Sequence, residues 1–204
     1  MKSTEFAKKY KNIKLETEHL IIRPPQKKDV KDIYNALQDP VFSKNISTMP
    51  YPYKMSDAEK YVKLSRELLN RREPSIMLVL YNKKDKRVIG TETLNWIDLK
   101  NLNCESGSWI AKPYWGSGLM AEARLEVFKF AFNKLKLHKI YSNILIYNIR
   151  SQKHIEKFGF KKQGIQRDEK LIKNKYYSMY CYDILSSEFN YNKLKKKLLR
   201  KQQI

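Results

Sequence analysis

The feature that most limits how this chain can fold is the segment 113–123, which reads PYWGSGLMAEA. A strand pattern ends just before it, two glycines follow one residue apart, and a long helical pattern begins at once. A helix N-terminus carries unpaired backbone N–H groups and partial positive charge. Gly116 and Gly118 allow the chain to wrap closely around an anion, so the amides of 116–120 could bind a pyrophosphate. A tight strand-to-helix turn explains the same residues, so this segment alone leaves the ligand open.

The elements on either side of this segment predict a mixed α/β fold. The expected strands 103–111 and 139–147 are joined by a helix over 119–136, which predicts a right-handed crossover between parallel strands. Before it, Asp29 and a Ser56–Glu59 capping box mark two helix starts on either side of a contact-rich loop over 40–55. The other expected elements are strands at 19–23, 75–81, 88–96, 160–172 and 176–185, and a helix at 149–158 that ends before Gly159.

A chain of 204 residues favours one domain rather than two. We expect a basic, mobile extension over 1–14, a compact domain over 15–190, and a basic amphipathic helix or tail over 191–204. No internal repeat and no linker divides the sequence.

Four blocks in a fixed order give a more specific indication than the glycines alone. They are LIIRPPQKKDVKDIYNALQDP (20–40), ESGSWIAKPYWGSG (105–118), YNIRSQKHIEKFGFKKQG (147–164) and NKYYSMYCYDILSSEF (174–189). Together they resemble the RimJ/RimL branch of the GNAT superfamily of N-acetyltransferases. The superfamily loop is Q/R-x-x-G-x-G/A, and this chain departs from it at Trp115 and Met120, as the RimJ/RimL branch also does. The resemblance covers about 15–190.

The resemblance implies the acyl-CoA N-acyltransferase fold, a mostly antiparallel sheet with helices on its faces. One parallel strand pair would splay to admit the pantetheine arm of acetyl-CoA, the implied co-substrate. Asn148 reads either as a helix N-cap or, by resemblance, as a pantetheine contact. Arg150, Lys153 and Lys157 could contact the adenosine 3′-phosphate of acetyl-CoA, although most lysines in so basic a chain are simply solvated. The residues implied to bind the cofactor are Ile110, Ala111, Trp115, Gly116, Ser117, Gly118, Leu119, Met120, Asn148, Arg150 and Ser151.

Acetyl transfer to an amine needs a neutral amine and a proton for the departing thiolate. An α-amine with a pKa near ~8 needs less help to lose its proton than a lysine near ~10.4. By resemblance, Glu105 is the general base, acting through a water, and Ser151 is the proton donor. Glu92 and Glu169 are rival bases, and Tyr147 is a rival acid. Equally, Glu105 reads as an ordinary strand carboxylate and Ser151 as a first-turn helix serine.

The amine acceptor is the least defined part of the prediction. We expect contacts from Tyr51, Trp96 and Tyr176, on the loop 42–53, a strand end and the hairpin 167–177. By resemblance, the acceptor is a protein N-terminal α-amine, notably of a ribosomal protein. A small-molecule amine such as an antibiotic, an amino sugar or a polyamine is one alternative. A non-catalytic RNA-binding protein on the same fold is another.

Charge and cysteine content limit the remaining possibilities. The chain has 42 Lys+Arg against 21 Asp+Glu, a formal net charge of +21, which predicts attraction to polyanions and possible weak RNA contact through the basic termini. Its two cysteines and three histidines show no metal-ligand spacing, so we expect no metal. No signal peptide and no apolar run of the ~20 residues that cross a bilayer is visible. We expect a cytoplasmic monomer or homodimer that is not bound to a membrane.

Overall fold

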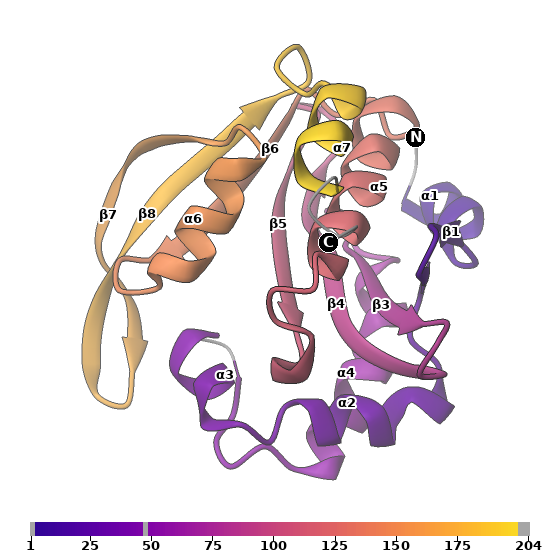
Figure 1. Cartoon of the computed structure of the whole chain (residues 1–204), viewed down its shortest axis with the longest axis vertical. Coiled ribbons are helices and arrows are strands. Elements are labelled where there is room, and N and C mark those ends of the chain that lie inside the picture. Colours follow the sequence, from indigo (N-terminus) through magenta and orange to yellow (C-terminus); the bar gives the residue numbers. More distant parts are fainter. Residues whose placement is uncertain (1–2, 47–48, 200–204) are drawn as a thin grey trace.

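A single eight-stranded sheet organises the computed structural model, which describes residues 3–46 and 49–199 (Figure 1). The strand order is β1-β2-β3-β4-β5-β6-β8-β7, and among these pairs only β5 and β6 run parallel. The predicted mixed α/β fold with one parallel pair is therefore confirmed. The strands are β1 Leu15–Glu16, β2 Leu20–Arg23, β3 Ile76–Asn82, β4 Arg87–Asp98, β5 Asn103–Ile110, β6 Lys139–Leu145, β7 Lys161–Ile172 and β8 Lys175–Leu185.

The parallel pair is short. Residues 103–105 of β5 pair with 139–141 of β6, and no further backbone pairing joins these two strands in the described chain. Just beyond the paired stretch, the Ser142 hydroxyl donates to the Ser106 carbonyl at 2.9 Å, and the two hydroxyl oxygens also lie 2.9 Å apart. After this point the strands diverge, because β6 continues with β8 while β5 continues with β4 (Figure 1).

Helices cover both faces of the sheet. One buried cluster joins α1, α5, α7 and the end of α6 to the sheet, and a second cluster lies under α2, α3 and α4. The helix α5 provides the crossover between β5 and β6. The helices are α1 Ser3–Tyr10, α2 Val30–Ala36, α3 Pro40–Asn45, α4 Met55–Leu68, α5 Leu119–Asn133, α6 Ile149–Lys157 and α7 Tyr191–Leu199, with 3-10 turns at η1 Lys27–Asp29 and η2 Lys112–Tyr114.

The N-terminal segment differs from the expected mobile extension. Residues 3–10 form α1, and its side chains Phe6, Ala7 and Tyr10 are buried in the main core. Their spacing places all three on one face of a helix, while the neighbouring lysines point to solvent. The predicted C-terminal helix is α7, although 200–204, like 1–2, lie outside the described residues.

The loop 40–55 also differs from expectation. Its first part forms α3, because Pro40 suits a first helical turn and Asp39 caps it by accepting the Val41 N–H at 2.9 Å. Residues 47 and 48 of this loop lie outside the described chain. The next helix begins one residue before the predicted cap, and its first-turn Asp57 accepts the Lys54 N–H at 2.9 Å.

The predicted helix start at Asp29 is only partly right. A short 3-10 turn precedes α2, and the buried Asp29 carboxylate accepts two hydrogen bonds from Arg23 and one from the Gln26 N–H rather than capping the helix. This ion pair closes the turn after β2. Within 3–46 and 49–199, no helix has both the length and the apolar character needed to cross a bilayer.

Candidate active site

A cleft of about 1600 Å³ opens where β5 and β6 diverge. Residues of both strands line it, together with α6, the start of α5 and part of β7. Figure 1 shows α5 beside β5 and α6 beside β6, on either side of the divergence. The short parallel ladder therefore creates the cleft, and the two helices flank it.

At one end of the cleft the chain forms the glycine turn predicted from sequence. Gly116 and Gly118 have φ of 81° and 82°, the left-handed region that other residues enter at a cost. A Cβ at Gly116 would meet no atom within 4 Å, so its backbone conformation rather than crowding requires glycine. Among the described residues, no partner is recorded for the backbone amides of Gly116, Gly118 and Met120. These amides stand at the N-terminus of α5, where an anion would be stabilised.

A stacked pair joins this turn to α6. The Arg150 guanidinium carbon lies 3.3 Å from the centre of the Trp115 ring, whose Nε1–H donates to the Ile110 carbonyl at 2.8 Å. Burial lowers the pKa of Arg150. The ordinary pKa of an arginine is so high that the guanidinium remains charged. A fixed positive charge therefore stands beside the glycine turn. On the same helix, Asn148 is the N-cap and accepts the Ser151 N–H at 3.2 Å.

The predicted base, Glu105, lies on β5 at the other end of the cleft. Its Oε1 accepts from the Asn143 side chain at 3.3 Å, across the parallel pair. Burial raises the pKa of this carboxyl, and the Asn143 contact and the positive charge of Lys170 oppose the rise. Glu105 thus has one weak neutral partner and an open side toward the cleft, an arrangement compatible with accepting a proton.

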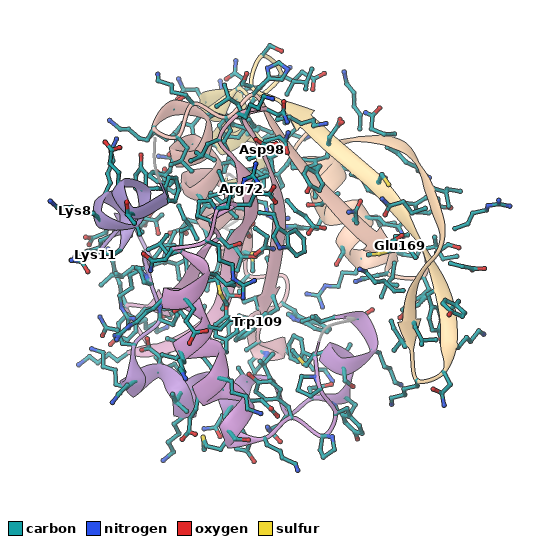
Figure 2. All side chains as sticks on the ribbon, turned by 180° about the vertical axis from the view of Figure 1, so that it is seen from behind. Lys8, Lys11, Arg72, Asp98, Trp109 and Glu169 are labelled. Carbon is teal, nitrogen blue, oxygen red and sulfur yellow. The ribbon has the colours of Figure 1, made fainter. Side chains whose placement is uncertain are left out.

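The rival carboxylates are placed differently. Glu92 is fully buried and ion-paired with Arg124, whose Nε lies 3.2 Å from Oε2. Burial raises the pKa of Glu92 to about 7, although Arg124 opposes this rise. Glu169 is exposed on β7 and lies 3.8 Å from Lys170 (Figure 2). Of the two rivals, only Glu169 lines the cleft.

The candidate proton donors lie on or beside α6. Ser151 is half-buried, lies in the first turn of α6 and lines the cleft. Tyr147 also lines it, but its hydroxyl donates to the Lys44 carbonyl at 2.5 Å, and burial raises its pKa. Its ring contacts Tyr177 of β8 at 5.3 Å between centroids. Tyr147 therefore links the end of α3 to the β7–β8 hairpin, and its proton is already engaged.

The cleft gathers most of the predicted site residues but not all. It is lined by Trp96, Glu105, Ile110, Trp115, Gly116, Gly118, Met120, Asn148, Arg150 and Ser151. Ala111, Ser117 and Leu119 support the glycine turn without lining the cleft; the Ser117 hydroxyl donates to the Tyr114 carbonyl at 2.7 Å. Tyr51 and Tyr176 are exposed outside it, and Tyr51 lies under Lys173 at the hairpin turn, 4.7 Å from ring to Nζ.

Sequence reasoning missed several polar side chains in the cleft wall, among them Asn143 and the following three. Arg124 projects from α5, His154 from α6 and Gln166 from β7. His154 follows Ser151 by three residues, a helical spacing that could have indicated a shared face. Gln166 precedes a register shift in the β7–β8 pairing, where Asp168 has a φ of 50°. Nothing in the sequence marks that irregularity.

Comparison with known proteins supports the same interpretation of the cleft. The family model for the acetyltransferase (GNAT) domain matches residues 19–161, more than half of the chain. The chain belongs to the GNAT acetyltransferase family. The resemblance to the GNAT family is therefore confirmed, as is the expectation of an N-acetyltransferase.

Two GNAT relatives illustrate the range of similarity. An uncharacterized N-acetyltransferase p20 of Bacillus licheniformis is 26% identical over 175 residues, covering 86% of this chain and 97% of p20. The [Ribosomal protein uS5]-alanine N-acetyltransferase of Escherichia coli is 28% identical over 94 residues, covering 46% of this chain and 48% of that enzyme. Among solved structures, Mycobacterium smegmatis RimJ in complex with CoA-disulfide has a TM-score of 0.77 at 14% identity, covering 87% and 88%.

GNAT acetyltransferases use acetyl-CoA, and the cleft suits this molecule. Its anionic end needs hydrogen-bond donors, which the amides of the glycine turn and Arg150 can supply. Its arm needs a slot between strands, which the divergence of β5 and β6 provides. No group of three or more His, Cys, Asp or Glu placed to hold a metal occurs among the described residues.

Proposed function

We propose that this enzyme transfers the acetyl group of acetyl-CoA to the N-terminal α-amine of a protein, such as a ribosomal protein, in the cytoplasm. The observation that carries the proposal is that one cleft is lined by Gly116 and Gly118 of the turn after β5, by Ser151 of α6, and by Glu105 near the start of β5. These groups match what direct acetyl transfer requires. Acetyl-CoA supplies the activated acetyl thioester.

Glu105 prepares the amine for attack. A carboxylate whose pKa is raised by burial is a stronger base than an exposed glutamate. It takes one proton from the acceptor's ammonium through a water. The neutral nitrogen then forms the new C–N bond. Asn143 holds the Glu105 carboxylate in place during this step.

Ser151 completes the exchange of protons. When the C–S bond breaks, the Ser151 hydroxyl gives its proton to the sulfur and regains a proton from the new amide nitrogen through a water. Ser151 thus ends neutral, and Glu105 releases the proton of the ammonium to solvent. Because Asn148 accepts the Ser151 N–H, the first turn of α6 is fixed and the hydroxyl is held at one place in the cleft wall. The amides of 116–120 and Arg150 fix the anionic end of acetyl-CoA.

The acceptor end of the cleft supports an amine substrate. Its oxygen acceptors are the carboxylates of Glu105 and Glu169 and the Gln166 side-chain oxygen, while Trp96 adds an exposed ring, 53% accessible. An α-ammonium group is attracted by such a set even in a protein of net charge +21. The same charge favours approach to ribosomal RNA, and one GNAT relative is named as a ribosomal-protein alanine N-acetyltransferase.

The test is thiol release from acetyl-CoA in the presence of an acceptor panel. The panel contains peptides with N-terminal Ala, Ser or Met, the same peptides blocked at the N-terminus but carrying lysine, polyamines and aminoglycosides. We expect release only with free N-terminal peptides, confirmed by mass spectrometry of the acetylated residue. Release with a polyamine or an aminoglycoside alone would move the acceptor to a small amine. No release with any acceptor, together with salt-sensitive RNA binding, would overturn the enzymatic proposal.

A further inference from the structure

Unpaired buried polar atoms are concentrated in the cleft. In the described residues, three buried side-chain polar atoms have no hydrogen-bond partner: Tyr61 Oη, His154 Nε2 and Gln166 Oε1. The last two belong to residues that line the cleft. Burying such an atom without a partner is unfavourable, so two of them in one cavity indicate that a ligand supplies the partners.

His154 lies on the acetyl-CoA side of the cleft. It is on α6, three residues after Ser151, so both side chains lie on one helix face. Its ring packs on Phe158 at 5.3 Å between centroids, which fixes its plane. The Arg124 guanidinium lies 5.6 Å from the same Phe158 ring and is held by Glu92. His154 is therefore a rigid wall group beyond Ser151.

The chemistry of the ring limits what its partner can be. Burial, together with the smaller effect of the charges of Arg124, Lys157 and Arg150, lowers the pKa of His154 to about 3. The imidazole is neutral at physiological pH, with one nitrogen as donor and the other as acceptor. A phosphate would favour a protonated ring, whereas an amide suits a neutral one, because an amide offers both a donor and an acceptor.

We propose that His154 Nε2 hydrogen-bonds an amide of the pantetheine arm of acetyl-CoA, and that His154 is a positioning residue for the thioester. The inference rests on the proposed use of acetyl-CoA and not on the identity of the acceptor. His154 thereby fixes the pantetheine arm against α6, next to Ser151. The hydrogen bond also removes the cost of the unpaired nitrogen when acetyl-CoA is bound.

Calorimetric titration with two ligands tests the proposal. CoA carries the pantetheine arm, whereas adenosine 3′,5′-bisphosphate keeps the nucleotide phosphates and lacks it. We expect His154→Phe to weaken CoA binding about tenfold, the loss of one hydrogen bond, and to leave the bisphosphate affinity unchanged. His154→Gln, whose amide reaches a similar position, should restore most of the CoA affinity. His138→Phe, at an exposed position, is the matched control and should change neither affinity.

A stability measurement separates binding from structural support. Without ligand, His154→Phe removes an unpaired buried nitrogen, so its Tm should rise by about 2–4 °C even though CoA binds less well. An equal loss of affinity for both ligands, or a lower Tm with unchanged CoA affinity, would overturn the proposal.

Wild-type protein provides a readout that needs no variant. The ¹⁵N resonance of His154 Nε2 should shift on addition of CoA and not on addition of the bisphosphate. An unchanged resonance with saturating CoA would overturn the assignment. If CoA binds as described but no amine is acetylated, the proposed function fails and the role of His154 in binding stands.

Discussion

The two ends of the cleft are built in different ways. The acetyl-CoA end is built around one continuous segment, in which β5, the glycine turn and α5 follow one another directly, with Arg150 of α6 beside the turn. The acceptor end takes its side chains from three strands: Trp96 from β4, Glu105 from β5, and Gln166 and Glu169 from β7. The first end offers mainly backbone amides, and the second end offers side chains. Figure 2 shows Glu169 of the acceptor end far from Lys8 and Lys11 of the N-terminal segment.

This difference indicates which residues can be substituted at each end of the cleft. Backbone amides are present whatever the side chains are, so the acetyl-CoA end tolerates Trp115 and Met120 in place of the usual motif residues. Side chains from three strands can change one at a time, so the acceptor end can be altered without disturbing the amides of the other end. Substitutions at the two ends should therefore affect different kinetic constants.

The largest expected effect is on turnover, at the acceptor end. Glu105→Gln should lower kcat by about 10²–10⁴-fold, the usual contribution of a general base, while the Kd for CoA stays unchanged. Because burial raises the pKa of Glu105, the wild-type kcat/KM should fall as the pH drops through a value above the ordinary glutamate pKa. That acidic limb should be absent from the variant in a pH–rate profile.

Glu169→Gln is the comparison for this prediction, because Glu169 is the exposed carboxylate of the same cleft. A larger loss of kcat in Glu169→Gln than in Glu105→Gln would assign the base to Glu169.

The next effect belongs to the acetyl-CoA end. The double change Gly116→Ala and Gly118→Ala places two alanines in the left-handed region. Each raises the free energy of the turn's present conformation by about 1–2 kcal/mol. We expect CoA affinity to fall about 30- to 1000-fold in calorimetry. Gly164→Ala is the matched control, since its Cβ would meet nothing within 4 Å and its φ is not positive. Unchanged CoA affinity in the double variant would remove the turn from the binding site.

Ser151→Ala tests the point at which the two ends meet. Water can replace the hydroxyl in part, so we expect a loss of about 10- to 100-fold in kcat and little change in the Kd for CoA. Ser151→Cys, which keeps a proton on a similar side chain, should retain more activity than the alanine variant. If the alanine variant instead loses CoA affinity at full kcat, Ser151 is a binding residue.

The smallest effect concerns recognition of the acceptor by Gln166. Gln166→Met keeps the length of the side chain and removes the oxygen, so the acceptor KM should rise about 5- to 20-fold at unchanged kcat. Gln166→Glu keeps an acceptor oxygen and should remain near wild type. On the same strand, Gln163 is exposed and donates to Asp183 at 2.9 Å, so Gln163→Met should leave the KM unchanged. Equal KM values in the two methionine variants would contradict the role of Gln166.

The sequence predicted the parts of the structure that depend on neighbours along the chain. The glycine turn, the Asn148 cap and the left-handed Gly159 after α6 follow from local rules, and so does the crossover through α5. The same rules missed α1, although Phe6 and Tyr10 have helical spacing, because the many lysines around them outweighed three apolar residues.

The remaining parts depend on contacts between distant segments. The pairing of Glu92 with Arg124 joins residues 32 positions apart, and no local sequence rule predicts it. The unpaired atoms of His154 and Gln166 could not be predicted either, because a missing partner is a property of the folded cavity. Asn143, the partner of Glu105, comes from a strand 38 positions further along.

The short parallel ladder between β5 and β6 has a consequence for motion. Two sheet halves, one of five strands and one of three, meet at the β5–β6 junction. In the described chain this junction has three backbone residue pairs, the Ser106–Ser142 contact and the Asn143–Glu105 hydrogen bond. A small change in the angle between the two sheet halves would move the far ends of β7 and β8 by a larger distance. We therefore expect amide hydrogen exchange at 139–141 to slow when acetyl-CoA fills the cleft. This measurement reports on the junction between the two halves without a label in the cleft.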